Sequence, residues 1–209
     1  MIKYSALKRL FDILVALISL MILAPVYITI YLFILREIGR PVFFAQIRPG
    51  LNEKTFKLYK FRTMTNARDE EGNLLPDSMR LTSFGGLLRK TSMDEFPEFF
   101  NIFKGDMSFV GPRPLLVKYL PYYTGREKLR HTIRPGLTGL AQISGRNALG
   151  WGKRLGLDAD YVENMCFKLD MLILFKTIFK VLRSEDIAVD TSRIEPGLDE
   201  ERQRNCSDK

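Results

Sequence analysis

The sequence has few of the residues from which disulfides and zinc sites are built. It contains two cysteines, one histidine and one tryptophan in 209 residues. Cys166 falls in an apolar helical pattern and Cys206 in a polar tail, so we expect no structural disulfide and a reducing compartment. One histidine without any Cys/His spacing argues against zinc. No serine or cysteine nucleophile motif with a matching base is visible, and neither is an internal repeat.

Basic and apolar residues are abundant instead. The formal net charge is +8, and 46% of the residues are hydrophobic, with fifteen phenylalanines. A basic balance fits nucleic acid, an anionic membrane surface or phosphate-bearing substrates. The hydrophobic content excludes a mostly disordered chain, and the length suffices for one moderate core. His131 stands among arginines and a lysine, which favours a surface position over a catalytic role.

One apolar run near the N-terminus is long enough to enter a membrane. Residues Ile13–Leu35 contain no charge over 23 positions, and a membrane helix needs about 20. A signal peptide fits less well, because the run is too long and no small-residue cleavage site follows it. We therefore place this segment in the membrane.

The basic residues on both sides of the apolar run, and one proline within it, indicate whether the run crosses the membrane. The basic residues on its two sides are Lys3, Lys8, Arg9, Arg36, Arg40 and Arg48. Because such residues favour the cytoplasmic side, both flanks qualify for it. Pro25 removes a backbone hydrogen bond and predicts a kink. The residues alone leave a re-entrant helix and a kinked spanning helix equally favoured. Lys8 and Asp12, four residues apart, are expected to pair at the interface.

After residue 40 the pattern changes to that of a globular domain. The segment 41–64 has a short apolar stretch, the turn Pro49-Gly50-Leu51-Asn52 and an alternating stretch, which predicts a β-hairpin. Its lysines and arginines are read as a solvated face that can also meet lipid phosphates. The polar segment 66–80 is expected to be a surface loop or a mobile lid.

Two adjacent acids stand at the start of a phenylalanine-rich helix. The segments 81–90 and 96–104 have helical patterns, with phenylalanines at helical spacing that face the core or a membrane. Ser92 and Glu95 match a capping box, although Pro97 favours a helix start nearer Asp94. Acids at a helix start commonly just complement the dipole. The same position can hold a phosphate, which an aspartate with a divalent cation would attack.

Arginines in rigid or glycine-rich surroundings follow the acid pair. Pro112 and Pro114 restrict the backbone around Arg113, so its guanidinium loses little entropy on meeting an oxyanion. The loop "IRPGLTGLAQISGRN" (133–147) carries Arg146 between glycines and suits an anionic ligand. Residues 167–183 predict a basic amphipathic helix, for an anionic interface or for core packing. Beyond Ser184 the sequence predicts a flexible tail.

Taken together, these segments resemble the bacterial sugar transferase family, the monotopic phosphoglycosyl transferases. The similarity is to its small members of the PglC type. It runs through "LKRLFDI", "FAQIRPGLNEKTFKLYKFRTM", "LRKTSMDEFPEFFNIFKGDMSFVGPRPLL", "RPGLTGLAQISGRNAL" and "LDMLILFKTI". Several ordered motifs over nearly the whole chain to about residue 183 are far more specific than any one of them.

The resemblance implies transfer of a phospho-sugar from a UDP-sugar to undecaprenyl phosphate, with release of UMP. It makes Asp94 the nucleophile that forms a phosphosugar-aspartyl intermediate, with Glu95 as base or as organiser of the metal. It implies Mg²⁺ as cofactor, bound through Asp94. The residues that it implies for substrate binding are Arg89, Arg113, Arg146, Lys60, Arg62 and Asp158. The sugar it suggests is N,N′-diacetylbacillosamine or another N-acetylated sugar, and other UDP-sugars stay open.

The resemblance also implies an architecture and a location. We expect a helix-rich α+β fold with a re-entrant membrane helix (1–38), a catalytic domain (39–185) with interfacial amphipathic helices, and a flexible tail (186–209). The family breaks its re-entrant helix at a Ser-Pro or similar pair, and here the pair is Ala24-Pro25. The expected site of action is the cytosolic face of the bacterial inner membrane. Membrane lipid is an expected partner, a homodimer is one arrangement compatible with the family, and nucleic acid is not expected.

Two other functions compete with this interpretation. A membrane-tethered nucleic-acid binder would account for the charge and predicts salt-sensitive retention of DNA or RNA, but no binding motif is present. A non-catalytic membrane scaffold predicts that Asp94→Asn changes only local helix stability.

Overall fold

The computed structural model describes residues 2–145, 149–183 and 196–207. Its helices are α1 (Ile2–Ile22), α2 (Ala24–Glu37), α3 (Asp77–Arg80), α4 (Ser83–Lys90), α5 (Glu98–Lys104), α6 (Leu140–Ile143), α7 (Trp151–Asn164), α8 (Phe167–Leu182) and α9 (Leu198–Ser207). Its strands are β1 (Phe43–Pro49), β2 (Thr55–Phe61), β3 (Ser108–Val110) and β4 (Gly136–Thr138). The predicted helix-rich α+β class is confirmed.

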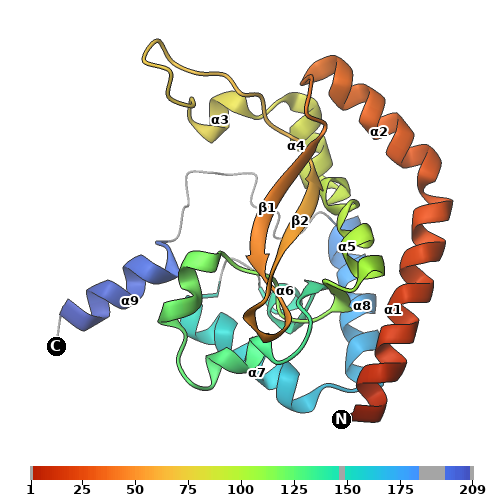
Figure 1. The fold of residues 1–209 in the computed structure, drawn as a ribbon, viewed down its shortest axis with the longest axis vertical. Coiled ribbons are helices and arrows are strands. Elements are labelled where there is room, and N and C mark those ends of the chain that lie inside the picture. Colours follow the sequence, from red (N-terminus) through yellow and green to blue (C-terminus); the bar gives the residue numbers. More distant parts are fainter. Residues whose placement is uncertain (1, 146–148, 184–195, 208–209) are drawn as a thin grey trace.

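α1 and α2 are apolar helices that meet at a sharp bend and follow one side of the molecule (Figure 1). Pro25 lies in the first turn of α2, where its missing N–H costs no hydrogen bond. The two helices are bent by 61°. No single helix in the described ranges is long and apolar enough to cross a membrane, whereas this bent pair passes the test of length and composition. The predicted bend at Pro25 is confirmed.

The N-terminal helices also pack against the rest of the chain. Ala16 of α1 and Ile34 of α2 have no exposed surface, and α1 contacts α5 and β3. Asp12 is 2% exposed and accepts a hydrogen bond from the Phe109 backbone N–H at 3.2 Å. The expected interfacial pair of Asp12 with Lys8 is therefore wrong. Lys8 Nζ instead binds the carboxylate of Asp170 at 2.5 Å, because the tertiary fold brings α8 beside it.

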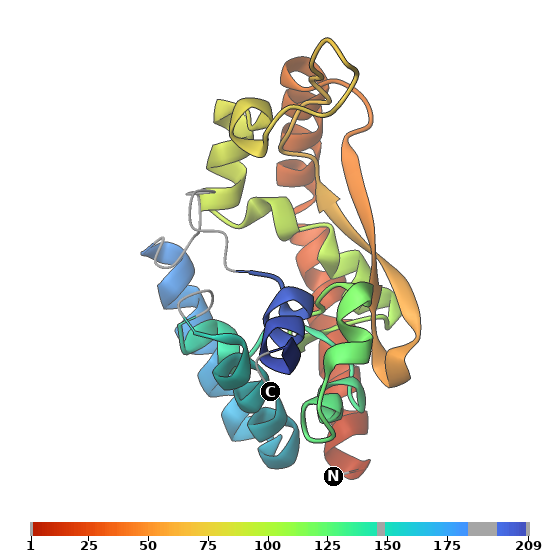
Figure 2. The ribbon, with the colours of Figure 1, turned by 90° about the vertical axis from the view of Figure 1, so that its left-hand side faces the viewer.

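β1 and β2 form the predicted hairpin, which crosses the middle of the molecule in Figure 1 and lies on the side away from α8 in Figure 2. The strands are antiparallel, with Phe43 opposite Phe61 and Pro49 opposite Thr55. The turn between them contains Asn52 in the left-handed region (φ 52°), a conformation that asparagine tolerates well. The hairpin prediction is confirmed.

β2 is anchored in two clusters of buried apolar side chains. Leu58 packs in a cluster with Ile102 of α5 and Ile173 of α8. Phe61 packs in another, with Ile34 of α2 and Leu88 of α4. Lys60 lies between these two anchors, so packing on both sides fixes its backbone position.

A short parallel sheet, which the sequence did not predict, joins β3 and β4. Ser108 pairs with Gly136 and Val110 with Thr138. Glycine is required at this junction, since a Cβ added to Gly136 would lie 2.1 Å from the backbone N of Gly111. The sheet therefore fixes the chain immediately before Arg113.

The described part of the C-terminal segment, residues 196–207, packs on the domain. Leu198 has no exposed surface and belongs to a cluster with Tyr119 and Trp151. Trp151 Nε1 donates to the carbonyl of Pro196 at 2.9 Å. The expectation of a flexible tail is wrong for these residues, because one leucine in a polar segment finds an apolar site that composition does not reveal.

Gly85 of α4 packs directly on the backbone of Thr63, and this contact can be tested. A Cβ at Gly85 would lie 1.9 Å from the Thr63 carbonyl oxygen, whereas one at the adjacent Gly86 would meet nothing within 4 Å. Overpacking typically costs about 1–3 kcal/mol, so Gly85→Ala should lower the melting temperature by about 3–8 °C. Gly86→Ala should leave it unchanged or raise it, because alanine favours a helix. Thermal unfolding followed by circular dichroism measures both, and equal melting temperatures would contradict the contact.

Candidate active site

A cleft of about 1070 Å³ lies beside the hairpin. Segments far apart in the sequence line it, including both hairpin strands, α4, the turn after α4, the segment after β3, and α6 to α8. Its volume suits a ligand of nucleotide-sugar size. Its basic lining residues are Arg48, Lys60, Arg62, Arg80, Arg89, Arg113, Arg130 and Arg154. This excess of cations over the lining carboxylates Asp94, Glu95 and Asp158 favours an anionic ligand.

Asp94 and Glu95 lie on a tight 3-10 turn, Met93–Glu95, between α4 and α5. Ser92 adopts the left-handed region (φ 56°) at the end of α4, and α5 begins only at Glu98. The predicted capping box of Ser92 and Glu95 is wrong, since the Ser92 side chain caps nothing. The turn instead places both acidic residues in the wall of the cleft.

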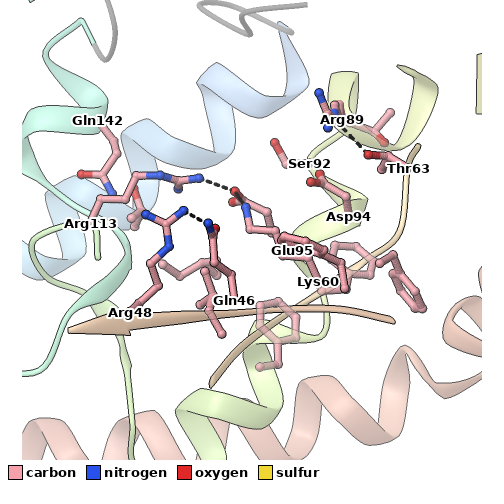
Figure 3. Close-up of a pocket in the computed structure, with 18 of the residues that line it drawn as sticks. Gln46, Arg48, Lys60, Thr63, Arg89, Ser92, Asp94, Glu95, Arg113 and Gln142 are labelled. Atoms are coloured by element: carbon pink, nitrogen blue, oxygen red, sulfur yellow. Dashed lines mark hydrogen bonds and ion pairs between the residues drawn. The ribbon is translucent and has the colours of Figure 1, made fainter. Parts of the chain in front are cut away.

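The carboxylate of Glu95 binds two cations at once (Figure 3). Lys60 Nζ from β2 and an Arg113 guanidinium nitrogen each lie 2.6 Å from the same oxygen, Oε1. Burial alone would raise the pKa of Glu95, but the charges of Arg113 and Lys60 hold that pKa well below its usual range. Glu95 in turn raises the pKa of Arg113. Glu95 is therefore a permanent anion that holds two cations in place.

A third carboxylate, Glu98, lies beneath this cluster. It is 2% exposed, and one of its oxygens lies 3.3 Å from Lys60 Nζ. Burial, followed by the charge of Glu95, raises the pKa of Glu98 to about 7. Lys60 thus lies between two acids of very different proton affinity.

Asp94 contrasts with its neighbour. Among the described residues no hydrogen bond or ion pair reaches its carboxylate, although Lys60, Arg113 and Arg89 act on it through their charge. Burial, and then the negative charge of Glu95, raise the pKa of Asp94 to about 6. An unpaired carboxylate that is more basic than usual, in a cationic cleft, has the properties of a nucleophile.

Two of the other predicted residues, Arg89 and Arg62, have different surroundings. Arg89 lines the cleft near Asp94 (Figure 3), and its Nε donates to the Thr63 hydroxyl at 3.0 Å. Arg62 is 8% exposed and donates to the backbone carbonyls of Met64 and Arg40 at 2.8 and 2.9 Å. These contacts brace the end of the hairpin, so Arg62 supports the cleft wall.

Asp158 acts through an arginine that the sequence analysis did not single out. It is 2% exposed and lies 3.1 Å from Arg130. Arg130 donates to the backbone carbonyl of Arg113 at 2.6 Å and to the Tyr123 hydroxyl at 2.7 Å. Burial raises the pKa of Asp158 to about 6. Asp158 and Arg130 therefore position the backbone from which Arg113 reaches Glu95.

Two further predictions on basic residues have different outcomes. Arg146, predicted to bind substrate, lies outside the described residues.

His131, expected at the surface, is 6% exposed and packs edge-on against Tyr123. That expectation is wrong, because the tertiary fold buries the imidazole together with its neighbour Arg130, which is 3% exposed. Burial and the charge of Arg130 lower the pKa of His131 to about 4, so it is neutral.

Sequence reasoning also missed Arg48 and Gln142, which line the same cleft. Arg48 donates to the Gln46 side chain at 2.6 Å (Figure 3). Gln142, on α6, is 7% exposed. The glycine-punctuated loop is the only sequence signal for Gln142, and Arg48 stands in the sequence as one of the basic residues that flank the apolar run.

The residues of the cleft fit a magnesium ion that is bound together with a phosphate. In the described ranges no three His, Cys, Asp or Glu side chains gather as a complete metal site. Mg²⁺, however, commonly takes one or two carboxylates and completes its shell with substrate phosphates and water. Asp94, whose carboxylate is unpaired in the cleft, meets that requirement.

The raised pKa of Asp94 predicts a cost in stability. The unfolded carboxyl has a pKa near 4, so between about pH 4 and 6 the folded protein binds more protons than the unfolded chain. The free energy of unfolding contributed by this group therefore falls as pH rises through that window. Asp94→Asn should raise the melting temperature at pH 7.5 by about 2 °C, and the difference should vanish at pH 4. A variant less stable than wild type at pH 7.5 would contradict the assignment.

Comparison with known proteins shows which family the sequence matches. A model of the family described as bacterial sugar transferase matches residues 3–184. The chain is 56% identical over 182 residues to the uncharacterized sugar transferase EpsL of Bacillus subtilis, covering 87% of this chain and 90% of that protein. It is 39% identical over 188 residues to the exopolysaccharide production protein ExoY of Sinorhizobium fredii, covering 82% and 83%.

A third relative has a more specific name. The undecaprenyl-phosphate galactose phosphotransferase of Salmonella typhimurium is 37% identical over 196 residues, which cover 86% of this chain but 41% of that longer protein. The aligned region is thus most of this chain and less than half of that relative.

Proposed function

The chain belongs to the bacterial sugar transferase family, and we propose that it transfers a phospho-sugar from a UDP-sugar to undecaprenyl phosphate and releases UMP. The observation that carries the proposal is the unpaired carboxylate of Asp94, with its raised pKa, in a cleft lined by cations. The Salmonella relative, whose name states undecaprenyl phosphate and a sugar-phosphate transfer, supports the choice of acceptor.

The proposed chemistry has two displacements at one phosphorus atom. A carboxylate oxygen of Asp94 attacks the sugar-bearing phosphorus, the bond from that phosphorus to the UMP oxygen breaks, and a phosphosugar-aspartyl intermediate forms. An oxygen of undecaprenyl phosphate then attacks the same phosphorus, which yields the polyprenyl diphosphate sugar and frees Asp94. Two easier steps replace one difficult transfer.

The other charged residues support this attack without forming bonds. Glu95, held as an anion by two cations, is too weak a base to remove a proton efficiently. We therefore assign it to the orientation of Lys60 and Arg113, which would neutralise the diphosphate. Mg²⁺, held by Asp94 and the substrate phosphates, would supply further charge neutralisation.

The sugar is the least specified part of the proposal. The resemblance suggests N,N′-diacetylbacillosamine or another N-acetylated sugar, whereas the Salmonella relative is named for galactose. Both kinds of sugar therefore belong in the set of donors to be tested. The relative named for exopolysaccharide production supports a role in polysaccharide assembly.

Exchange of label between UMP and the UDP-sugar tests the covalent mechanism. With Mg²⁺ and no lipid acceptor, wild-type protein should transfer labelled UMP into UDP-sugar, because the aspartyl intermediate forms reversibly. Asp94→Asn should abolish this exchange, with a loss of at least about 10³-fold. A panel of UDP-glucose, UDP-galactose, UDP-N-acetylhexosamines and UDP-N,N′-diacetylbacillosamine would identify the sugar.

A matched control is Asp160→Asn, which alters a half-exposed acid paired with Arg126 on the surface. It should retain exchange. Exchange by Asp94→Asn at the wild-type rate would exclude the aspartyl intermediate. UMP release only in the presence of undecaprenyl phosphate would indicate a single displacement. If folded wild-type protein shows neither exchange nor UMP release with any of the sugars, the result would favour a non-catalytic membrane scaffold.

We further propose that α1 and α2 enter the cytosolic leaflet of the bacterial inner membrane and return to the same side. The pair is bent by 61°. Its exposed apolar side chains include Leu10, Leu14, Ile18, Met21, Ile22, Ile28, Leu32 and Phe33, and such a surface needs a partner. Exposed Phe175, Ile178 and Phe179 make α8 a candidate interfacial helix. A homodimer stays a prediction.

Thiol labelling distinguishes a re-entrant pair from a spanning one. In a background with Cys166→Ser and Cys206→Ser, single cysteines would replace Ser5 before the bend or Glu37 after it. Because both ends of a re-entrant pair face the cytosol, a membrane-impermeant reagent should label neither in intact spheroplasts and both after lysis. Labelling of just one position in intact spheroplasts would establish a spanning segment. Recovery of the protein in the soluble fraction, without membranes, would contradict insertion of α1 and α2 into the bilayer.

A further inference from the structure

The wall of the cleft away from Asp94 contains buried polar atoms without partners. Neither Oε1 nor Nε2 of the Gln142 amide has a hydrogen-bond partner in the described part of the chain, although the residue is only 7% exposed. The Nε atoms of Arg48 and Arg130 are likewise buried and unpaired there. Buried polar groups in folded proteins are nearly always paired, so this cluster indicates contacts that a ligand completes.

The fold makes room for the Gln142 side chain. Gln142 lies on α6, the short helix that begins directly after Gly139. A Cβ added to Gly139 would lie 2.7 Å from the amide oxygen of Gln142. Figure 3 shows Gln142 and Arg113 on one side of the cleft, and Asp94 and Arg89 on the other. The carboxylate of Glu95 lies between these two groups and is bound by Arg113.

The direction of the reaction relates these two ends of the cleft. This step rests on the proposed function. Attacking and leaving oxygens at a transferred phosphoryl group lie roughly in line. When Asp94 attacks, the UMP oxygen must therefore leave on the opposite side of the phosphorus. That direction leads toward Arg113, which suits the phosphate of UMP, and then toward Gln142, where its nucleoside would lie.

We propose that Gln142 binds the uracil base of the nucleotide donor. The free edge of uracil presents an N3–H donor between two carbonyl acceptors. A carboxamide presents one acceptor and one donor side by side, so Oε1 can accept from N3–H while Nε2 donates to one carbonyl. The unpaired Nε of Arg48 supplies a further donor for the second carbonyl or the ribose. Gln142 is thus a specificity-determining residue for the nucleotide, independent of the sugar.

Binding of the separate parts of the substrate tests this assignment. Calorimetric titration of purified Gln142→Met with UMP should give a Kd about tenfold above wild type, as expected for a lost two-point base contact. The Kd of UDP-sugar should rise by a similar factor. The Kd of inorganic pyrophosphate, which has no base, should stay within about twofold. Gln203→Met makes the same change outside the cleft, where Gln203 donates to Tyr122, and should bind UMP as wild type does.

Each other result would overturn the assignment. An unchanged Kd for UMP would mean that the amide contacts no part of the nucleotide. A loss for UDP-sugar alone would place the amide at the sugar, and an equal loss for pyrophosphate would show that it acts on the phosphates through Arg113. If Gln142→Met fails to fold, Gln142→Asn, which withdraws the amide by one methylene, should give the same pattern. Wild-type protein that binds neither UMP nor any UDP-sugar would refute the proposed function itself.

Discussion

The carboxylate of Glu95 is the point at which otherwise separate parts of the fold meet. Lys60 reaches it from the hairpin and Arg113 from the segment after β3, each at 2.6 Å from the same oxygen. Removing charges from water is costly, and their mutual attraction repays that cost only where the geometry is good. A buried ion cluster of this kind therefore adds little to the free energy of unfolding. Its consequence is that two cations are held at set positions beside Asp94 before any ligand arrives, which is the preorganisation that phosphoryl transfer requires.

The rest of the structure maintains that cluster from both sides. On one side, Leu58 and Phe61 anchor β2 in two different cores and leave Lys60 between them. On the other, Arg130 holds the carbonyl of Arg113 and is itself held by Asp158. The close backbone approach of Gly136 to Gly111 fixes the start of the same segment. Residues remote from the reaction thus determine where the arginine lies.

Adjacent acids in one turn have opposite proton affinities because their partners differ. Glu95 has two cations in direct contact, so its pKa falls below the usual range, whereas Asp94 has none in contact, and burial with the neighbouring negative charge raises its pKa to about 6. When environments separate the pKa values of two carboxyl groups, they also separate their roles. The more basic and unpaired oxygen is suited to attack phosphorus, and the permanently ionised one to organise cations.

The sequence by itself determined the elements that depend on local pattern: the hairpin, the bend at Pro25, the helices around the acid pair, and the family. These follow from periodicity, from proline chemistry and from ordered motifs, all of which are local. Only the tertiary structure decided which charges meet. Lys8 binds Asp170 rather than Asp12, Glu95 holds Lys60 and Arg113 instead of capping a helix, and His131 and Leu198 are buried. Such partners are separated by up to 162 residues along the chain, and ion pairing acts through distances in space that no pattern along the sequence records.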